Sequence, residues 1–148
     1  MIMRVPQFER LFRQAASLDV DKDDLKRLSD FLGEKIYDLL VVAERNAKYN
    51  ARDVIYEPDL PVTKGLAETL REFEQMDVAP ELEPVLEHLA GLPPLDLEVS
   101  EDVRALLPKL AGALVVAAAR VLRELDPDVK NPQTEHWERL DRVFDQLI

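Results

Sequence analysis

The sequence contains no cysteine and only four glycines among its 148 residues. The absence of cysteine excludes disulfides, thiolate metal ligands and cysteine nucleophiles. The longest apolar run, residues 110–119, is about half of the roughly 20 residues that a membrane-spanning helix needs, and residues 1–10 lack the apolar core of a signal peptide. These absences favour a soluble cytoplasmic protein without a membrane partner.

The sequence also lacks the motifs of common catalytic and cofactor sites. It has no glycine-rich nucleotide loop, P-loop or nucleophile elbow, and His88 and His136 do not stand at metal-ligand spacing. An Asp-x-Asp-x-Asp triplet at residues 19–23 resembles the start of a calcium loop. However, Asp24 and Asp30 replace the glycine and glutamate that this loop needs at its sixth and twelfth positions. We therefore expect no catalytic residue, metal or cofactor, and a protein that is not an enzyme.

Acidic residues outnumber basic ones along the whole chain. The 30 acidic and 19 basic residues give a net charge of −11. The first 77 residues hold 12 basic and 16 acidic side chains, and the remainder holds 7 and 14, so there is no basic tail. Because DNA binding draws most of its affinity from Lys and Arg, this charge disfavours DNA as a partner.

What the sequence does have is a long amphipathic segment within residues 20–60. Asp21 or Asp23 can cap its start, and a loop closes it. At about 1.5 Å per residue, a helix over residues 24–50 would run roughly 40 Å, so other helices must cross it to bury its apolar stripe. The stripe repeats every three or four residues and consists of Leu25, Leu28, Leu32, Ile36, Leu39, Ala43 and Ala47.

A shorter amphipathic helix is predicted on each side of the long one. The first covers residues 6–16 and the third covers residues 63–76. Pro58 and Pro61 mark the loop between the long helix and the third helix, because proline cannot continue a helix. The first half of the chain therefore has the order short, long, short.

The second half repeats this order. Residues 80–86 repeat the pattern of residues 6–12, and at an offset of 79 Gly112 matches Gly33. The last helix is predicted at residues 135–148. The chain is therefore expected to consist of two related halves.

The second long helix has two features of its own. Pro108 lies inside it and should kink it or delay its start. Residues 110–119 are apolar on all sides, which implies burial from several directions. We expect the two halves, residues 1–77 and 78–148, to cover each other in one compact domain.

Several positions within residues 6–60 carry a family resemblance. Arg10 and Arg13 lie on the first helix, and the second loop has the pattern R-x-x-I-x-x-x-D-[IL], beginning at Arg52 and with its aspartate at Asp59. In these features the segment resembles the histone fold of the minimal archaeal histones. In that family the Arg and Asp of this pattern form a salt bridge that fixes the loop, so the resemblance implies a structural clamp between Arg52 and Asp59.

With its internal repeat, the whole chain is similar to the double histone-fold proteins of bacteria and archaea. A single histone fold leaves its apolar stripe open and dimerises to cover it. The resemblance therefore implies an all-α fold of two tandem histone folds packed as an intramolecular pseudodimer. The two long helices should cross, and the second half is the more diverged.

The DNA-contacting positions of the histone family are altered in this chain. Where histones present basic residues or threonine to phosphates, the chain has Asp19 in the first loop and Asp53 and Val54 in the second. In the second half Pro84 and Glu87 stand at the places of Arg10 and Arg13. Attraction to phosphate is thereby lost and repulsion is added.

The sequence therefore favours a non-enzymatic scaffold for protein–protein association. Its partner would be another protein or a second copy, with self-association through outer helices such as the last one, which bears Trp137 and Phe144. The alternative is a weak histone-like nucleoid protein. Its candidate DNA-binding residues are Arg10, Arg13, Lys22, Arg45 and Lys48.

Overall fold

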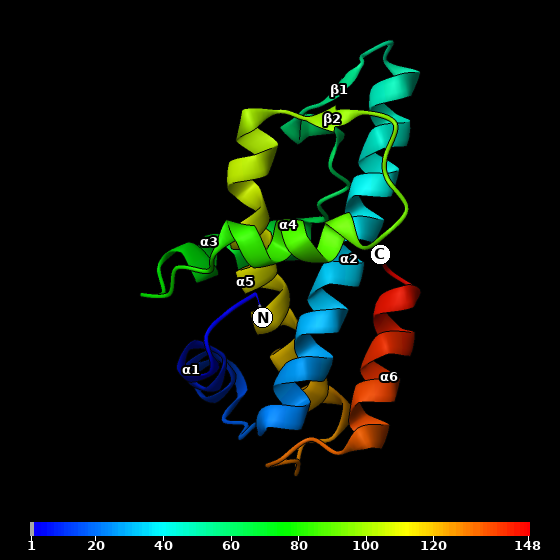
Figure 1. Cartoon of the computed structure of the whole chain (residues 1–148). Helices are drawn as coiled ribbons and strands as arrows, with labels where there is room; N and C mark the ends of the chain where they lie inside the picture. The colour runs from blue at the N-terminus through cyan, green and yellow to red at the C-terminus, as the bar shows by residue number, and fades with distance from the viewer. Residues whose placement is uncertain (1) are drawn as a thin grey trace.

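A computed structural model describes residues 2–148, and Figure 1 shows the arrangement of its elements. This part of the chain forms six α-helices, two strands of two residues each and one short 3-10 turn. The predicted helical class is confirmed, whereas the sequence did not indicate the strands. The elements are α1 (Val5–Ala16), α2 (Lys22–Tyr49), β1 (Val54–Ile55), η1 (Glu57–Asp59), α3 (Lys64–Glu74), α4 (Leu82–Ala90), β2 (Glu98–Val99), α5 (Glu101–Leu125) and α6 (Thr134–Asp145).

Helix α2 begins at a reciprocal cap made by two aspartates. Asp21 Oδ1 accepts a hydrogen bond from the Asp24 N–H, and Asp24 Oδ2 accepts one from the Asp21 N–H, both at 2.9 Å. These bonds satisfy backbone donors that have no partner within the helix. The helix then runs for 28 residues and is followed by Ala51 in the left-handed conformation, with φ 57°. Of the two predicted caps, Asp21 is the one used.

Helix α5 is the centre of the fold. The fully apolar stretch that was expected to be buried from several directions is buried at nine of its ten positions, all except Ala117. The expectation that Pro108 would delay the start of the helix was wrong, since α5 begins at Glu101 and runs through Pro108. Ser100 caps this start by accepting a hydrogen bond from the Val103 N–H at 3.2 Å, and proline removes only one later helical bond.

The short helices α1, α3 and α4 pack across the long ones, as Figure 1 shows. Helices α1 and α3 lie against α5, α4 lies against α2, and α6 runs beside α2 (Figure 1). Two glycines make room for these crossings. Gly112 of α5 lies under the ring of Phe73 of α3, and Gly33 of α2 lies under the ring of His88 of α4.

Loops from distant parts of the chain join at both ends of the long helices. Strand β1, after α2, pairs in parallel with β2, before α5. At the other end the Asp19 N–H donates to the Lys130 carbonyl at 2.8 Å. The Arg123 guanidinium strengthens that end, because it donates to the Ala16 carbonyl at 2.7 Å and to the Val129 carbonyl at 2.6 Å. No pattern in the sequence singled out Arg123.

Candidate interaction surfaces

Arg52 and Asp59 form an ion pair inside the second loop. Asp59 is 2% exposed, and its other carboxylate oxygen accepts a hydrogen bond from the Tyr56 N–H at 2.9 Å. Burial by itself would raise the pKa of Asp59, but the Tyr56 hydrogen bond and the Arg52 guanidinium outweigh it and hold that pKa below its ordinary value. Asn46 of α2 donates to the Asp59 carbonyl at 2.9 Å, so the paired loop is also tied to the long helix.

Three candidate DNA-binding residues lie at one end of the molecule, and two of them have partners within the chain. Arg10 donates to the Asp77 carbonyl, and Arg13 lies 3.5 Å from the Asp19 carboxylate. Both arginines are exposed. Lys22 is exposed at the start of α2. Asp19 of the first loop therefore offsets the charge of Arg13.

The other two candidates, Arg45 and Lys48, lie at the opposite end of α2. Arg45 follows Lys22 by 23 positions, which correspond to about 34 Å of helix. Lys48 Nζ lies 2.7 Å from Asp96 Oδ2 and 3.7 Å from Glu44 Oε1. The hydrogen bond from Lys48 lowers the pKa of Asp96 and, reciprocally, raises the pKa of Lys48. The five candidates therefore fall into two groups at opposite ends of α2.

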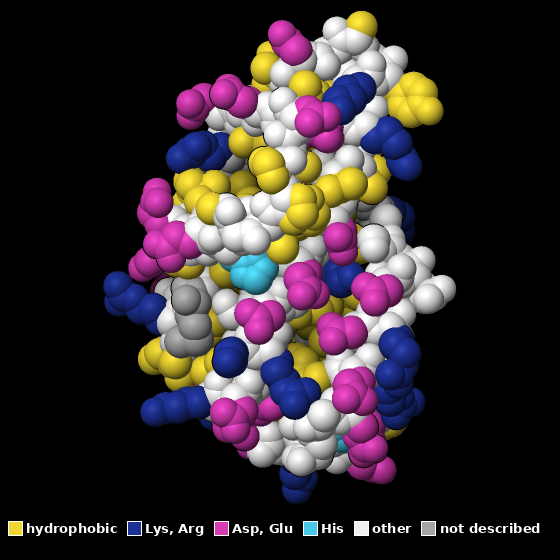
Figure 2. Space-filling view, turned by 45° about the vertical axis from the view of Figure 1, so that its right-hand side comes forward, with side chains coloured by type: hydrophobic (Ala, Val, Ile, Leu, Met, Phe, Trp, Pro, Cys, Tyr) yellow, Lys and Arg dark blue, Asp and Glu magenta, His cyan; other side chains and the backbone are white. Residues whose placement is uncertain are grey.

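The surface charge does not form a continuous basic field on the face that Figure 2 displays. Basic side chains lie there singly or in small groups among acidic ones (Figure 2). Such dispersed charges give a phosphate backbone no extended track to follow.

Helix α6 uses its aromatic side chains to attach to the rest of the fold. Trp137 and Phe144 are only 4% and 5% exposed. The Phe144 ring meets Phe31 of α2 edge-on at 5.0 Å, and the Trp137 Nε1–H donates to Asp24 at 2.9 Å. These two aromatic residues are therefore covered by α2, and self-association through the outer side of α6 stays a prediction.

Lys35 is a buried charge that the sequence did not reveal. Its side chain is 3% exposed, and its Nζ pairs with Asp145 of α6 and, at 3.3 Å, with Asp38 of its own helix. Burial lowers the pKa of Lys35, but the hydrogen bonds to Asp145 and Asp38 outweigh burial and raise it overall. This residue therefore joins α2 to the end of α6 as an ammonium ion.

His136 ties the start of α6 to the end of α5. Its Nδ1 accepts a hydrogen bond from the Gln133 N–H at 2.9 Å, so in the neutral ring the proton lies on Nε2. That nitrogen donates to the Asp126 carboxylate at 2.9 Å, which lowers the pKa of Asp126. Both ring nitrogens thus form hydrogen bonds within the fold, and His136 serves as a structural residue.

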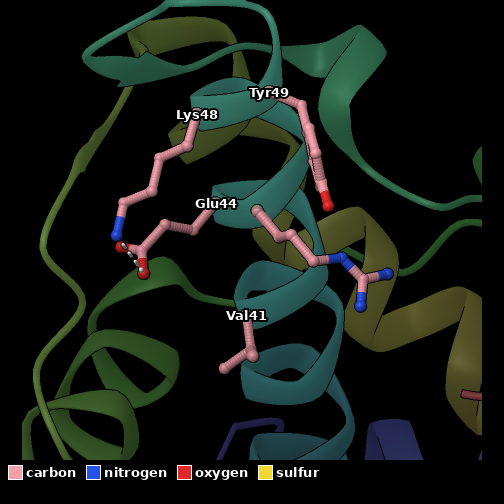
Figure 3. Close-up of a pocket in the computed structure, with 5 residues that line it drawn as sticks. Val41, Glu44, Lys48 and Tyr49 are labelled. Carbon is pink, nitrogen blue, oxygen red and sulfur yellow. Dashed lines mark ion pairs between the residues drawn. The ribbon is translucent and has the colours of Figure 1, made fainter.

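A surface hollow lies on the outer side of α2, near its end. It has a volume of about 590 Å³ and is lined by Val41, Glu44, Arg45, Lys48 and Tyr49. Figure 3 shows Lys48 turned toward Glu44, away from Tyr49. Val41 is 42% and Tyr49 83% exposed, so apolar surface meets water here.

The described residues, 2–148, contain no group of three or more His, Asp or Glu side chains placed to hold a metal ion. Four further hollows in the described part of the chain have volumes between about 200 and 380 Å³. One of about 200 Å³ lies between α2 and α6 over the edges of Phe31 and Trp137, with Arg27 and acidic residues at its rim. The hollow on the outer side of α2, with its exposed Val41 and Tyr49, is therefore the main candidate for contact with another molecule.

Comparison with known proteins places the chain in a family. Residues 8–145 match the family described as Domain of unknown function (DUF1931). The chain belongs to this family. Two proteins of Aquifex aeolicus (strain VF5), both described as uncharacterized, are similar to it. One is 26% identical over 150 residues, covering 99% of this chain and 87% of the relative. The other is 29% identical over 143 residues, covering 88% and 83%.

Two crystal structures share the fold. A protein from Thermus thermophilus is 74% identical, with a TM-score of 0.96 and coverage of 100% of both chains. Protein AQ328 from Aquifex aeolicus is 24% identical, with a TM-score of 0.83 over 99% of this chain and 97% of that one, and this likeness concerns the fold alone. The arrangement of helices described above is thus shared with both of these crystallised proteins.

One helix of this DUF1931 chain, α5, is long and apolar enough to cross a membrane by length and composition alone. Its most apolar window has a mean hydropathy of 1.8, and 61% of that window is buried inside the fold. Burial by α1, α3 and α6 is typical of the central helix of a water-soluble protein. The location of the protein in the cytoplasm stays a prediction.

Proposed function

We propose that the chain is a tandem histone fold that acts as a non-enzymatic scaffold for protein association. The order short, long, short occurs in α1 to α3 and again in α4 to α6. The halves also cover each other, because α1 and α3 of the first half pack on α5 of the second. These features support the resemblance to paired histone folds.

The observation that carries the fold assignment is the joining of loops at both ends of the molecule. The loop after α2 joins the loop before α5 through β1 and β2, and the loop after α1 joins the loop after α5 through Asp19 and Lys130. Each junction thus links a first loop of one half to a second loop of the other. Paired loops of this kind are what the histone resemblance implies for two units that share one core.

The charge of the surface supports a protein partner rather than DNA. The net charge is −11, and Arg13 and Lys48 are already paired with carboxylates. A protein that binds the phosphate backbone of DNA needs unpaired Lys and Arg side chains that can replace the counterions of the DNA. A scaffold for protein association does not need such unpaired basic side chains.

A weak DNA-binding role is the second candidate, and one observation favours it. Within the described part of the chain, Lys22 and Arg45 are exposed and form no ion pair. They could meet phosphates at two separate points, with Arg10, Arg13 and Lys48 contributing after release of their present partners.

The deciding experiment is fluorescence anisotropy with a labelled duplex of about 60 base pairs, titrated from low to physiological salt. The scaffold proposal predicts no binding even at low salt. Binding that weakens steeply with salt, and that is reduced in a Lys22→Glu/Arg45→Glu variant, would instead support the DNA role. Affinity purification of the tagged chain from its source cells tests the scaffold directly. Absence of both a co-purifying protein and self-association would contradict it.

A further inference from the structure

The outer face of α2 carries an ordered stripe of side chains that no other element covers. Glu34, Asp38, Val41, Arg45 and Tyr49 follow one another at intervals of three or four residues, so they lie along one side of the helix. All are exposed except Asp38, which is partly exposed. The first two are acidic, Val41 lies in the middle, and Arg45 and Tyr49 follow. We call these five residues the α2 stripe.

The charge order makes the α2 stripe complementary to itself when it is reversed. If two copies lie antiparallel with Val41 at their crossing, each Arg45 faces the partner's Asp38. Each Tyr49 then lies over the end of the partner's α2 stripe that contains Glu34. A twofold axis repeats every contact, which is the commonest arrangement in protein dimers. We propose that the α2 stripe binds a second copy of this chain in this antiparallel manner.

The two most exposed large apolar side chains would be brought together by the same pairing. Tyr49 is 83% and Leu147 is 70% exposed. Leu147 follows Phe144 and Asp145 of α6, which contact Phe31 and Lys35 of α2. It therefore lies near the acidic end of the α2 stripe, where the partner's Tyr49 arrives. Burying both side chains is favourable by the hydrophobic effect.

The repeat explains why the contact closes as a dimer. At the offset of 79, Val41, Arg45 and Tyr49 correspond to Arg120, Glu124 and Asp128 of the second half. Arg120 is already paired with Glu72 at 2.6 Å. Because the second half carries charges at these positions, it offers no apolar equivalent of the α2 stripe. The association therefore stops at two copies rather than extending into a filament.

The size of the contact sets its strength. The α2 stripe spans 16 residues, or about 22 Å of helix from the first to the last. One helix face gives an area below the roughly 800 Å² per partner of a standard stable interface. Each copy also carries a net charge of −11, which opposes close approach. We therefore expect a reversible dimer with a dissociation constant of about 10 µM to about 1 mM.

This inference rests on the proposed scaffold function and names its partner. The test is sedimentation equilibrium of the full chain from about 10 µM to about 1 mM at moderate salt. The parent should follow a monomer–dimer equilibrium. Val41→Asp should raise the dissociation constant at least about tenfold, because it places two buried like charges at the crossing.

A compensating substitution makes the test specific. Arg45→Glu should weaken the dimer about tenfold, and adding Asp38→Asn should recover part of that loss, because it removes the carboxylate that the new glutamate would face while keeping an oxygen acceptor for Lys35. Arg71→Glu, on exposed α3 surface, is the matched control and should leave the equilibrium unchanged. Circular dichroism and the emission of buried Trp137 show whether each variant stays folded.

A parent that remains monomeric at the highest concentration overturns the inference, as does a control variant that weakens the dimer as much as Arg45→Glu. The failure of the inference can be separated from failure of the scaffold function. A monomeric chain that still co-purifies with another protein leaves the scaffold proposal standing, whereas a monomeric chain without a partner contradicts both.

Discussion

The crossing of α3 over α5 depends on a missing side chain at Gly112. A methyl group at this position would lie 2.0 Å from Cζ of Phe73 and 2.3 Å from both Cε atoms. Phe73 is 2% exposed, so its ring has no open path into solvent. The substitution Gly112→Ala therefore forces either the ring or the helix to move.

The magnitude follows from two opposing effects. Overpacking a core costs about 1–3 kcal/mol, and a clash with three atoms of a confined ring should lie near the upper end, at about 3 kcal/mol. Alanine favours the helix by about 1 kcal/mol relative to glycine. The free energy of unfolding should therefore fall by about 2 kcal/mol in net. At roughly 2–4 °C per kcal/mol for a chain of this size, the melting temperature should fall by about 4–8 °C.

Thermal and urea unfolding followed by circular dichroism measure this loss. Gly65→Ala is the matched control, because α3 leaves nothing within 4 Å of the added methyl group there, and its stability should be unchanged or slightly higher. In a Gly112→Ala/Phe73→Leu double variant the smaller side chain should relieve the clash, so the combined loss should be less than the sum of the single losses. A Gly112→Ala variant as stable as the parent, or fully additive losses, would refute this account of the crossing.

Three further predictions concern the loop clamp, the buried lysine and the second glycine crossing. Asp59→Asn should cost about 2 kcal/mol near neutral pH, whereas Glu138→Gln, at the corresponding exposed position of the second half, should be neutral in thermal unfolding. Because the pKa of Asp59 is lowered, its contribution is present at neutral pH and is lost as the pH falls below the ordinary value of 3.8, so the two variants should differ less near pH 3. Lys35→Met should change stability by less than about 1 kcal/mol, because its exposed carboxylate partners stay hydrated without it. Since the raised pKa of Lys35 makes its contribution disappear only as the pH rises through that pKa, alkaline unfolding should reveal any remaining difference. Gly33→Ala places a methyl group 2.1 Å from the His88 ring, which is partly exposed and can turn outward, so the loss in thermal unfolding should be smaller than at Gly112.

Much of the local structure follows from the sequence because helices are specified by neighbouring residues. The bounds expected for the first long helix, residues 24–50, differ from α2 by two residues at its start and one at its end. The apolar period and the capping Asp21 act within a few positions of one another. The seven-residue spacing of Arg52 and Asp59 is equally local, and the pair meets inside one loop. By contrast, the delayed start expected from Pro108 was wrong, because one missing hydrogen bond does not prevent a helix in which nine of the ten residues 110–119 are buried.

The tertiary structure alone decided which of the remaining side chains face water. Lys35 and Asp145 are 110 positions apart, and Trp137 and Asp24 are 113 apart, so no local pattern indicates that α6 covers this part of α2. The same packing buries the aromatic residues of α6 and leaves Val41 and Tyr49 on a helix face without a cover. The sequence by itself determined where the helices form, because that depends on residues close in the chain. Only the packing of distant helices determined which surfaces remain for a partner.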